Sequence, residues 1–152
     1  LPVAARSLLI VEDSELHRQT YDAVLQGLPL AVSYAATGAQ ALDSIDRNVF
    51  DAVVMNIQLP DIDGLAVIGE IRRREAAAGR PSCPILAVTA CAAPGESGRA
   101  AAAGASGFLA KPIAKDAFLE ELARLLAVSP RERPESDEQA WTGSDSSGYR
   151  VR

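Results

Sequence analysis

Five polar residues follow four short apolar runs of this chain, and their types could together bind a metal cation and a phosphoryl group. Glu12 and Asp13 end the first run, Asn56 ends another, and Thr89 and Lys111 end the remaining two. Carboxylate and amide oxygens suit a hard cation such as Mg²⁺, while an ammonium and a hydroxyl suit phosphoryl oxygens. This chemistry requires that the four runs end close together, so the elements that carry them decide whether a site exists.

The apolar runs alternate with segments of helical periodicity, which is the pattern of a parallel sheet with right-handed helical crossovers. We expect strands at residues 8–11, 30–35, 52–55, 85–88 and 108–110. We expect helices at residues 14–28, from residue 38 onward, and at 64–78, 94–103 and 114–128. Five such units in about 120 residues predict a flavodoxin-like, doubly wound α/β fold of strand order 2-1-3-4-5 with five helices, because a barrel needs eight units.

The first helix is expected to start at the N-cap Ser14 and to end at Leu28, because a residue before proline is pushed out of the α region. Its apolar stripe is expected to consist of Leu16, Val24, Leu25 and Leu28. His17 on the same helix is expected to be a solvated surface residue.

In an open parallel sheet, ligands bind beyond the carboxyl ends of the strands, where the strand order reverses. For the predicted order this point lies between the first and third strands, so Glu12, Asp13 and Asn56 should lie side by side there. Thr89 and Lys111 should flank them from the fourth and fifth strands. The sequence therefore predicts one polar site at the carboxyl edge of the sheet.

The composition suits one compact cytoplasmic domain. The chain has 152 residues, of which 48% are hydrophobic, enough for a sizeable core. Its net charge of −5 argues against nucleic acid as a partner. No apolar run approaches the roughly 20 residues of a membrane span, so no direct membrane contact is expected. Cys83 and Cys91 lack metal-ligand spacing and are expected to be reduced thiols.

We expect the domain to occupy residues 1–128 and residues 129–152 to form a disordered tail or linker. From Pro130 onward the chain consists mostly of Pro, Arg, Glu, Ser, Asp and Gly, with Trp141, Tyr149 and Val151 as its large apolar or aromatic side chains. Such a segment cannot bury enough apolar surface to offset the entropy lost on ordering.

From residue 8 to residue 126 the sequence resembles the receiver domains of two-component signalling. The resemblance lies in four motifs: VEDS at 11–14, MNIQLPDIDG at 55–64, VTA at 88–90 and AKPI at 110–113. The last three motifs, with the Ala/Gly-rich segment before Phe108, look most like receivers of hybrid sensor histidine kinases. The resemblance implies a role in phosphorelay signal transduction.

The resemblance also implies a metal site. Glu12 and Asp13 match the acidic pair that holds Mg²⁺ in the family. Gln58 matches the position whose backbone carbonyl completes the coordination of the ion, and the carbonyl oxygen of Asn56 could still be a ligand. With an amide in place of a carboxylate, the site has one negative charge fewer, so we expect weaker Mg²⁺ binding.

Three further positions match the phosphoryl-binding and switching groups of the family. Thr89 and Lys111 match the residues that contact the phosphoryl oxygens. Phe108 matches the aromatic switch residue, which turns inward when the threonine is drawn toward the phosphate. The resemblance therefore implies a catalytic set of Asn56, Thr89 and Lys111 and a switch pair of Thr89 and Phe108.

Asn56 departs from the family, which has the phospho-accepting aspartate there. A carboxylate oxygen can attack phosphorus, whereas a carboxamide is a very poor nucleophile because its nitrogen lone pair is delocalised. We therefore expect this form to be incompetent for phosphorylation. Two explanations remain open: a natural pseudo-receiver, or a normal Mg²⁺-dependent receiver whose acceptor aspartate was deliberately replaced.

The expected function is signalling through protein–protein contacts. The partners implied are a histidine kinase or a histidine phosphotransfer domain, or a second copy of the chain bound through the fourth helix, fifth strand and fifth helix. The chain is not expected to be an enzyme itself, because it lacks a kinase core, although a histidine kinase parent is possible. A remote alternative is a flavin- or nucleotide-binding protein of the same fold, but Glu12, Asp13 and Glu15 would repel a nucleotide phosphate.

Overall fold

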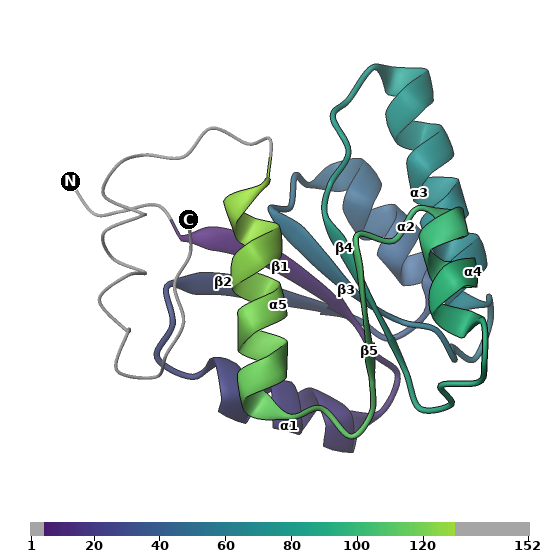
Figure 1. Cartoon of the computed structure of the whole chain (residues 1–152). Helices are drawn as coiled ribbons and strands as arrows, with labels where there is room; N and C mark the ends of the chain where they lie inside the picture. The colour runs from purple at the N-terminus through teal and green to yellow at the C-terminus, as the bar shows by residue number, and fades with distance from the viewer. Residues whose placement is uncertain (1–4, 130–152) are drawn as a thin grey trace.

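The computed structural model describes residues 5–129 and shows a five-stranded parallel sheet with helices on both faces (Figure 1). The strand order is β2-β1-β3-β4-β5, and every neighbouring pair is parallel. The strands are β1 (Arg6–Val11), β2 (Leu30–Ala35), β3 (Ala52–Asn56), β4 (Ile85–Thr89) and β5 (Gly107–Ala110). This arrangement confirms the predicted flavodoxin-like fold and its strand order.

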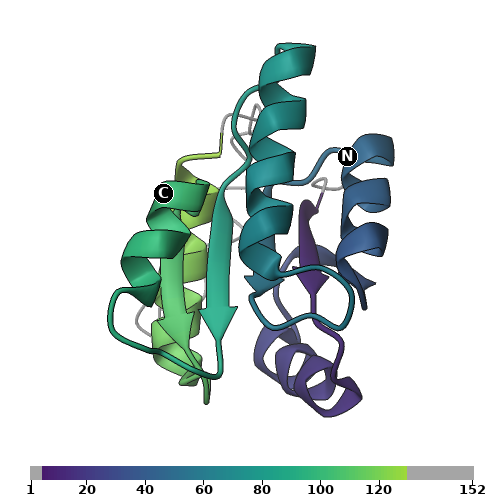
Figure 2. The ribbon, with the colours of Figure 1, turned by 90° about the vertical axis from the view of Figure 1, so that its right-hand side faces the viewer.

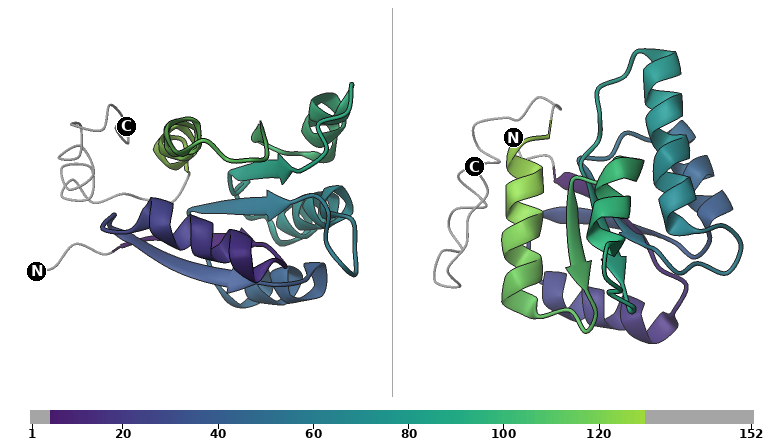
Figure 3. Two further views of the ribbon diagram at one scale, coloured as in Figure 1. Left: turned by 90° about the horizontal axis from the view of Figure 1, so that it is seen from below. Right: turned by 45° about the vertical axis from the view of Figure 1, so that its right-hand side comes forward.

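Five helices cross from one strand to the next or close the fold. They are α1 (Glu15–Leu25), α2 (Gly38–Arg47), α3 (Gly64–Ala78), α4 (Glu96–Ala103) and α5 (Lys115–Ala127). Helices α1 and α5 pack on one face of the sheet, and α2, α3 and α4 pack on the other (Figure 1). Seen at an angle, β5 lies at the edge of the sheet between α4 and α5 (Figure 3).

The central strands are covered on both faces, which explains why they are continuous apolar runs rather than alternating ones. All five residues of β3 and of β4 are buried, whereas β2 at the sheet edge alternates between exposed and partly buried positions until Ala35. One core cluster joins α1 and α5 to the sheet, and the other joins α2, α3 and α4. In the first cluster the rings of Tyr21 and Phe118 lie 5.4 Å apart, and complete burial of Phe118 contributes about 2–3 kcal/mol.

Helix α1 differs from its prediction in both length and buried stripe. It ends at Leu25, three residues before the predicted end, and Gly27 has a φ of +83°, a left-handed conformation that glycine adopts without steric cost. Leu16 was predicted to face the core, but it is 69% exposed. Tyr21 and Leu25 are the buried residues of the helix, and they belong to the core cluster that also contains Phe118 and Leu122 of α5.

Strand β1 begins two residues earlier than its apolar run suggests. Arg6 is buried, and its side chain forms an ion pair with Asp51 at 3.4 Å and donates to the carbonyl of Leu126 at 3.1 Å. A charged residue can extend a buried strand when it has such partners. At their other ends, β3 and β4 each run one residue further than predicted and include Asn56 and Thr89.

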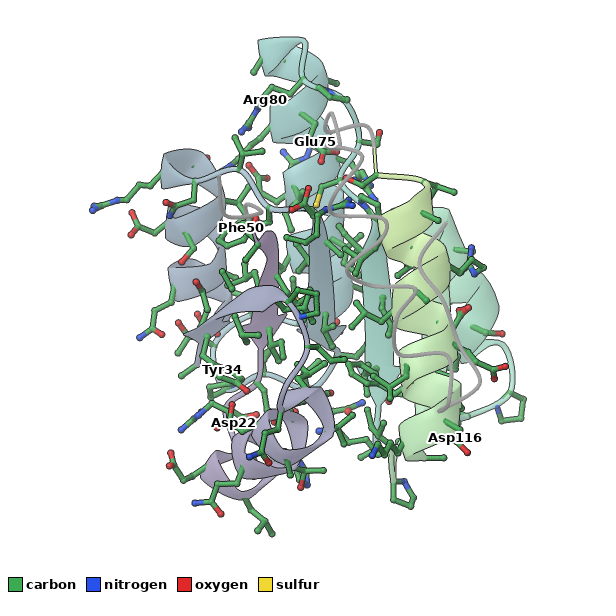
Figure 4. All side chains as sticks on the ribbon, turned by 90° about the vertical axis from the view of Figure 1, so that its left-hand side faces the viewer. Asp22, Tyr34, Phe50, Glu75, Arg80 and Asp116 are labelled. Atoms are coloured by element: carbon green, nitrogen blue, oxygen red, sulfur yellow. The ribbon has the colours of Figure 1, made fainter. Side chains whose placement is uncertain are left out.

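No helix within residues 5–129 is long and apolar enough to cross a membrane. The predicted tail at residues 129–152 lies outside this part of the chain except for Ser129. A cavity of about 230 Å³ lies at the amino end of β3, where Phe50, Glu75 and Arg80 line it (Figure 4). Asp116, in the first turn of α5 after the carboxyl end of β5, lies at the opposite end of the same view, so this cavity is far from the carboxyl edge of the sheet (Figure 4).

Candidate functional site

The carboxyl ends of the strands meet at one edge of the sheet, and their arrowheads point the same way (Figure 2). The register pairs Val11 with Met55, so Glu12 follows β1 beside the end of β3. Asn56 pairs with Val88, and Thr89 pairs with the last residue of β5, just before Lys111. The sheet therefore brings together the five polar residues that the sequence singled out.

Glu12 is almost completely buried, with 1% of its surface exposed, and its charge is compensated on several sides. Its Oε1 lies 2.7 Å from the ammonium nitrogen of Lys111. Its Oε2 accepts a hydrogen bond from the backbone N–H of Ser14 at 3.1 Å and a longer one of 3.5 Å from the amide of Asn56. A buried carboxylate is tolerated only with partners of this kind.

The side-chain amide of Asn56, which is 4% exposed, is directed at three oxygen atoms from two segments, the end of β1 and the loop after β3. Its Nδ2 donates to the backbone carbonyl of Gln58 at 2.6 Å, to Oδ1 of Asp13 at 3.2 Å and to Oε2 of Glu12 at 3.5 Å. Within residues 5–129, Oδ1 of Asn56 is one of the few buried polar side-chain atoms without a hydrogen-bond partner.

The loop between β3 and α3 is held in place by its aspartates and by one glycine. Asp61 accepts hydrogen bonds from the N–H groups of Gly38 and Ala39 at the start of α2, and these donors lower the pKa of Asp61 below its usual value. Asp63 is the N-cap of α3. The N–H of Gly64 donates to Ile57, and this close approach of the chain to the end of β3 fixes the carbonyl of Gln58 in the site.

The side chain of Gln58 connects this loop to the end of β4. Its Nε2 donates to Oγ1 of Thr89 at 2.9 Å, and its Oε1 accepts from the N–H of Ala90 at 3.2 Å. The hydroxyl of Thr89 also donates to the carbonyl of Cys91 at 3.2 Å. Thr89 is thus held by polar contacts from two loops.

Lys111 is placed by the end of β5, where its N–H donates to the carbonyl of Thr89 at 2.7 Å and a cis peptide bond precedes Pro112. Its ammonium nitrogen lies 2.9 Å from Nδ1 of His17 as well as 2.7 Å from Glu12. His17 lies at the surface, as expected, with its side chain 44% exposed, but it is not purely solvated, because its Nδ1 also lies 3.5 Å from Glu12.

A hollow of about 140 Å³ adjoins this cluster between α1 and the segment after β5. It is lined by His17, Thr20, Tyr21, Lys111, Pro112 and Ile113. Burial, and then the nearby charge of Glu12, raise the pKa of Tyr21, so its hydroxyl is neutral at physiological pH. The hollow offers one cation, one imidazole and an apolar wall to an approaching partner.

Phe108 lies in β5 and is partly buried against the core cluster formed with α2, α3 and α4. The structure thus places it neither fully in the core nor fully in solvent. Its role as a switch remains a prediction.

The groups at the carboxyl edge offer the oxygen ligands that a hard cation prefers, but they carry few negative charges. Oxygen atoms of Glu12, Asp13 and Gln58 converge on one point, and Mg²⁺ prefers oxygen ligands. However, residues 5–129 contain no group of three or more Asp, Glu, His or Cys side chains that could hold a metal ion. The third inward group is the neutral amide of Asn56, so the donors fit Mg²⁺ with a reduced charge.

Sequence reasoning missed two groups of the site. His17 contacts Lys111, although the sequence suggested only a surface position for it. The side chain of Gln58 contacts Thr89, although the sequence suggested a role only for the backbone carbonyl of Gln58. The signal available for His17 was its position one helical turn after Asp13, on the side of α1 that faces the acidic pair.

The fold and the polar edge define a signalling module of the doubly wound α/β class. Residues 8–123 match the family model of the response regulator receiver domain, and the chain belongs to that family, whose members act in two-component signalling.

Relatives of known function are similar over most of this chain. The transcriptional regulatory protein ZraR of Salmonella typhimurium is 33% identical over 120 residues, which cover 79% of this chain and 26% of ZraR. The hybrid signal transduction histidine kinase L of Dictyostelium discoideum is 33% identical over 118 residues, 76% of this chain and 7% of the kinase. The chain therefore spans about a quarter or less of the length of these two relatives.

Among solved structures, the receiver domain of the sensor histidine kinase PA1611 from Pseudomonas aeruginosa is 33% identical. The match has a TM-score of 0.71 and covers 81% of this chain and 98% of that domain. The PA1611 structure has a magnesium ion coordinated in the active-site cleft.

Proposed function

We propose that this chain is a receiver domain that cannot accept a phosphoryl group and that signals through contacts with other proteins. The observation that carries the proposal is the position of Asn56, which ends β3 between the acidic pair and the Thr89–Lys111 pair. This is where a receiver needs its nucleophilic carboxylate. Because an amide is a very poor nucleophile toward phosphorus, the remaining groups have nothing to activate.

In this proposal the carboxylates of Glu12 and Asp13 and the carbonyl of Gln58 would hold Mg²⁺, with Asn56 as a neutral fourth group. The bound ion would supply positive charge next to a phosphoryl group. Lys111 and the hydroxyl of Thr89 would orient the phosphoryl oxygens of a docking partner or of a small phosphate donor. With one carboxylate fewer than an aspartate-containing site, the ion binds more weakly.

The proposed partners are a cytoplasmic histidine kinase or a histidine phosphotransfer domain. The hollow lined by His17, Lys111 and Pro112 lies beside the acidic pair, so a partner that docks there also touches the site. A second copy of the chain is a further candidate. It would bind through the edge strand β5 and the two helices beside it, α4 and α5 (Figure 3). The chain acts in this proposal as a binding module and not as an enzyme.

The test is to incubate the chain with a small phosphate donor such as acetyl phosphate and Mg²⁺, and to measure its mass. We expect no phosphoryl adduct on the unaltered chain and one adduct on Asn56→Asp, since the other groups are in place. Asn48→Asp, which adds a carboxylate at an exposed asparagine after α2, is the matched control and should remain unmodified. A stable adduct on the unaltered chain would overturn the proposal.

The gene of the parent protein separates the two origins of Asn56. If the gene of the parent protein encodes asparagine at this position, the domain is a natural pseudo-receiver. If it encodes aspartate, the parent is a normal phosphorylated receiver and the asparagine is a deliberate replacement. Phosphorylation of Asn56→Asp shows in both cases that the pocket is otherwise competent, whereas its failure shows that the pocket has lost more than the acceptor.

A further inference from the structure

The amide nitrogen of Asn56 is placed where the three oxygen groups of the acidic pocket converge. Glu12 and Asp13 contribute carboxylates and Gln58 contributes a backbone carbonyl, at 3.5, 3.2 and 2.6 Å from Nδ2. These are the groups that would hold a cation. We infer that the amide of Asn56 acts as an internal substitute for Mg²⁺, so that this domain keeps its acidic pocket assembled without metal and Mg²⁺ must displace the amide to bind.

Electrostatics explains why the nitrogen side of the amide faces the pocket. The –NH₂ group carries partial positive charge and two donor hydrogens, so it attracts the carboxylates of Glu12 and Asp13. A carboxylate at position 56 would instead add a third negative charge at the same place, and like charges so close together need a proton or a cation between them. The asparagine therefore removes the repulsion and adds hydrogen bonds at once.

The other end of the same amide provides independent support. Oδ1 of Asn56 is buried and has no hydrogen-bond partner within residues 5–129, although an unsatisfied buried carbonyl is unfavourable. The three contacts of the nitrogen compensate the unfavourable burial of this oxygen. For a cation to enter, the amide nitrogen must leave the pocket, and all three of its contacts are then lost.

The inserted amide also affects the neighbouring loop. Gln58 accepts the shortest bond from Asn56 with its backbone and donates to Thr89 with its side chain. While the amide bridges the pocket, the position of Gln58 and its bond to Thr89 are maintained without metal. The inference rests on the metal-ligand assignment made above, but it does not depend on whether the chain accepts a phosphoryl group.

The experiment compares Mg²⁺ binding by the unaltered chain, Asn56→Asp and Asn56→Ala, using calorimetric titration with MgCl₂ and thermal melting with and without Mg²⁺. We expect the unaltered chain to bind Mg²⁺ most weakly, by about tenfold or more relative to Asn56→Asp, because ligand charge sets the affinity of such sites. Asn56→Ala should bind Mg²⁺ more tightly than the unaltered chain, since it removes the competing nitrogen. Asn48→Ala, at an exposed asparagine, is the control and should bind as the unaltered chain does.

Two results would overturn the inference and are distinguishable. If Asn56→Ala binds Mg²⁺ more weakly than the unaltered chain, the amide is a ligand through its oxygen and not a substitute for the ion. If none of the variants, including Asn56→Asp, binds Mg²⁺, the metal-ligand assignment itself fails and the inference fails with it. The first result leaves the phosphoryl-adduct test unaffected, whereas the second also removes the Mg²⁺ that Asn56→Asp is expected to need in that test.

A measurement on the unaltered chain decides the question even if Asn56→Ala does not fold. In ¹⁵N NMR spectra recorded with a chelator, the two side-chain protons of Asn56 should be protected from exchange with water, because the side chain is buried and its amide is hydrogen-bonded to Glu12 and Gln58. Their signals should persist unshifted until Mg²⁺ reaches concentrations far above those that saturate Asn56→Asp. Rapid exchange of these protons in the metal-free chain would overturn the inference.

Discussion

The ammonium nitrogen of Lys111 lies 2.7 Å from Oε1 of Glu12, whose side chain is 1% exposed. The two residues are 99 positions apart in the sequence, so this contact joins the end of β5 to the end of β1. Lys111 is therefore important for stability, because it compensates a charge that water cannot reach.

Replacing this lysine with an apolar residue should destabilise the fold. We expect Lys111→Met to lower the free energy of unfolding by about 3 kcal/mol, since removing one partner leaves a buried charge uncompensated. Urea denaturation monitored by circular dichroism measures the change. The control is Lys115→Met, at an exposed position in the first turn of α5, which should change stability by less than about 0.5 kcal/mol.

A double substitution tests whether the effect belongs to the pair. In Glu12→Gln/Lys111→Met the buried charge is absent, so the loss should be clearly smaller than the sum of the two single losses. Additive losses would show that the contact between the two side chains contributes little.

Gln58 is expected to hold the loop after β4 through its two bonds to Thr89 and Ala90. We predict that Gln58→Ala accelerates hydrogen exchange at the N–H groups of Ala90 and Cys91 and lowers stability by about 1 kcal/mol, the net value of a hydrogen bond in a partly exposed position. Hydrogen exchange followed by NMR measures the local effect.

The matched control for Gln58 is Gln40, whose Oε1 accepts a hydrogen bond from the N–H of Ala36 at 2.8 Å. Gln40→Ala should free a loop amide in the same way at a different place, while exchange at Ala90 stays unchanged. If both variants affect Ala90 equally, the effect of Gln58 is global and not local.

Two glycines of α3 should respond in opposite ways to alanine. A Cβ on Gly64 would collide with the carbonyl oxygen of Asn56 and lie 2.7 Å from Cα of Ile57, so Gly64→Ala should destabilise the fold by roughly 3 kcal/mol. Gly69 has no atom within 4 Å of such a Cβ, so Gly69→Ala should stabilise the helix by about 0.5–1 kcal/mol. Chemical denaturation of both variants measures the contrast, and equal effects would contradict the close approach at Gly64.

The contribution of Asp61 should depend on pH. Two backbone donors hold its pKa below its usual value of 3.8, so the folded state favours the charged form. A lowered folded pKa means that the stabilisation is present above the unfolded pKa and is lost as pH falls through the folded one. Asp61→Ala should therefore be less stable than the unaltered chain at pH 7, and the difference should shrink in acid.

Thermal or urea unfolding of the two proteins between neutral and acidic pH measures this convergence. The N–H groups of Gly38 and Ala39 should exchange faster in Asp61→Ala at pH 7, because they lose their acceptor. A stability difference that persists unchanged down to about pH 2 would contradict the role of the charged carboxylate.

The strand order and the five polar residues at the strand ends were predictable, because buried parallel strands are continuous apolar runs and their ends are marked by abrupt polar residues. Glu12, Asn56 and Lys111 could therefore be placed at one edge without coordinates. The strand order then decides which of these residues are neighbours, because it places the end of β1 beside the end of β3.

Other features could not be predicted because they depend on packing between distant segments. Periodicity suggested a buried Leu16, but the contacts of α1 with α5 bury Tyr21 and Leu25 instead. His17 contacts Lys111, which is 94 positions away in the sequence, so no local pattern predicts this contact. The direction of the Asn56 amide likewise depends on Asp13 and Gln58 together, and no local pattern contains it.

The two cysteines should differ strongly in reactivity. Burial, and then the charge of Glu75, raise the pKa of Cys83 to about 12, and its Sγ donates to the carbonyl of Phe50 at 3.3 Å. Cys91 is exposed. Because the thiolate is the reactive form, an aromatic disulfide reagent at neutral pH should modify one thiol per chain quickly and the second only after unfolding. Cys91→Ser should abolish the fast reaction and Cys83→Ser should leave it intact, whereas two fast equivalents in the unaltered chain would show that Cys83 is accessible.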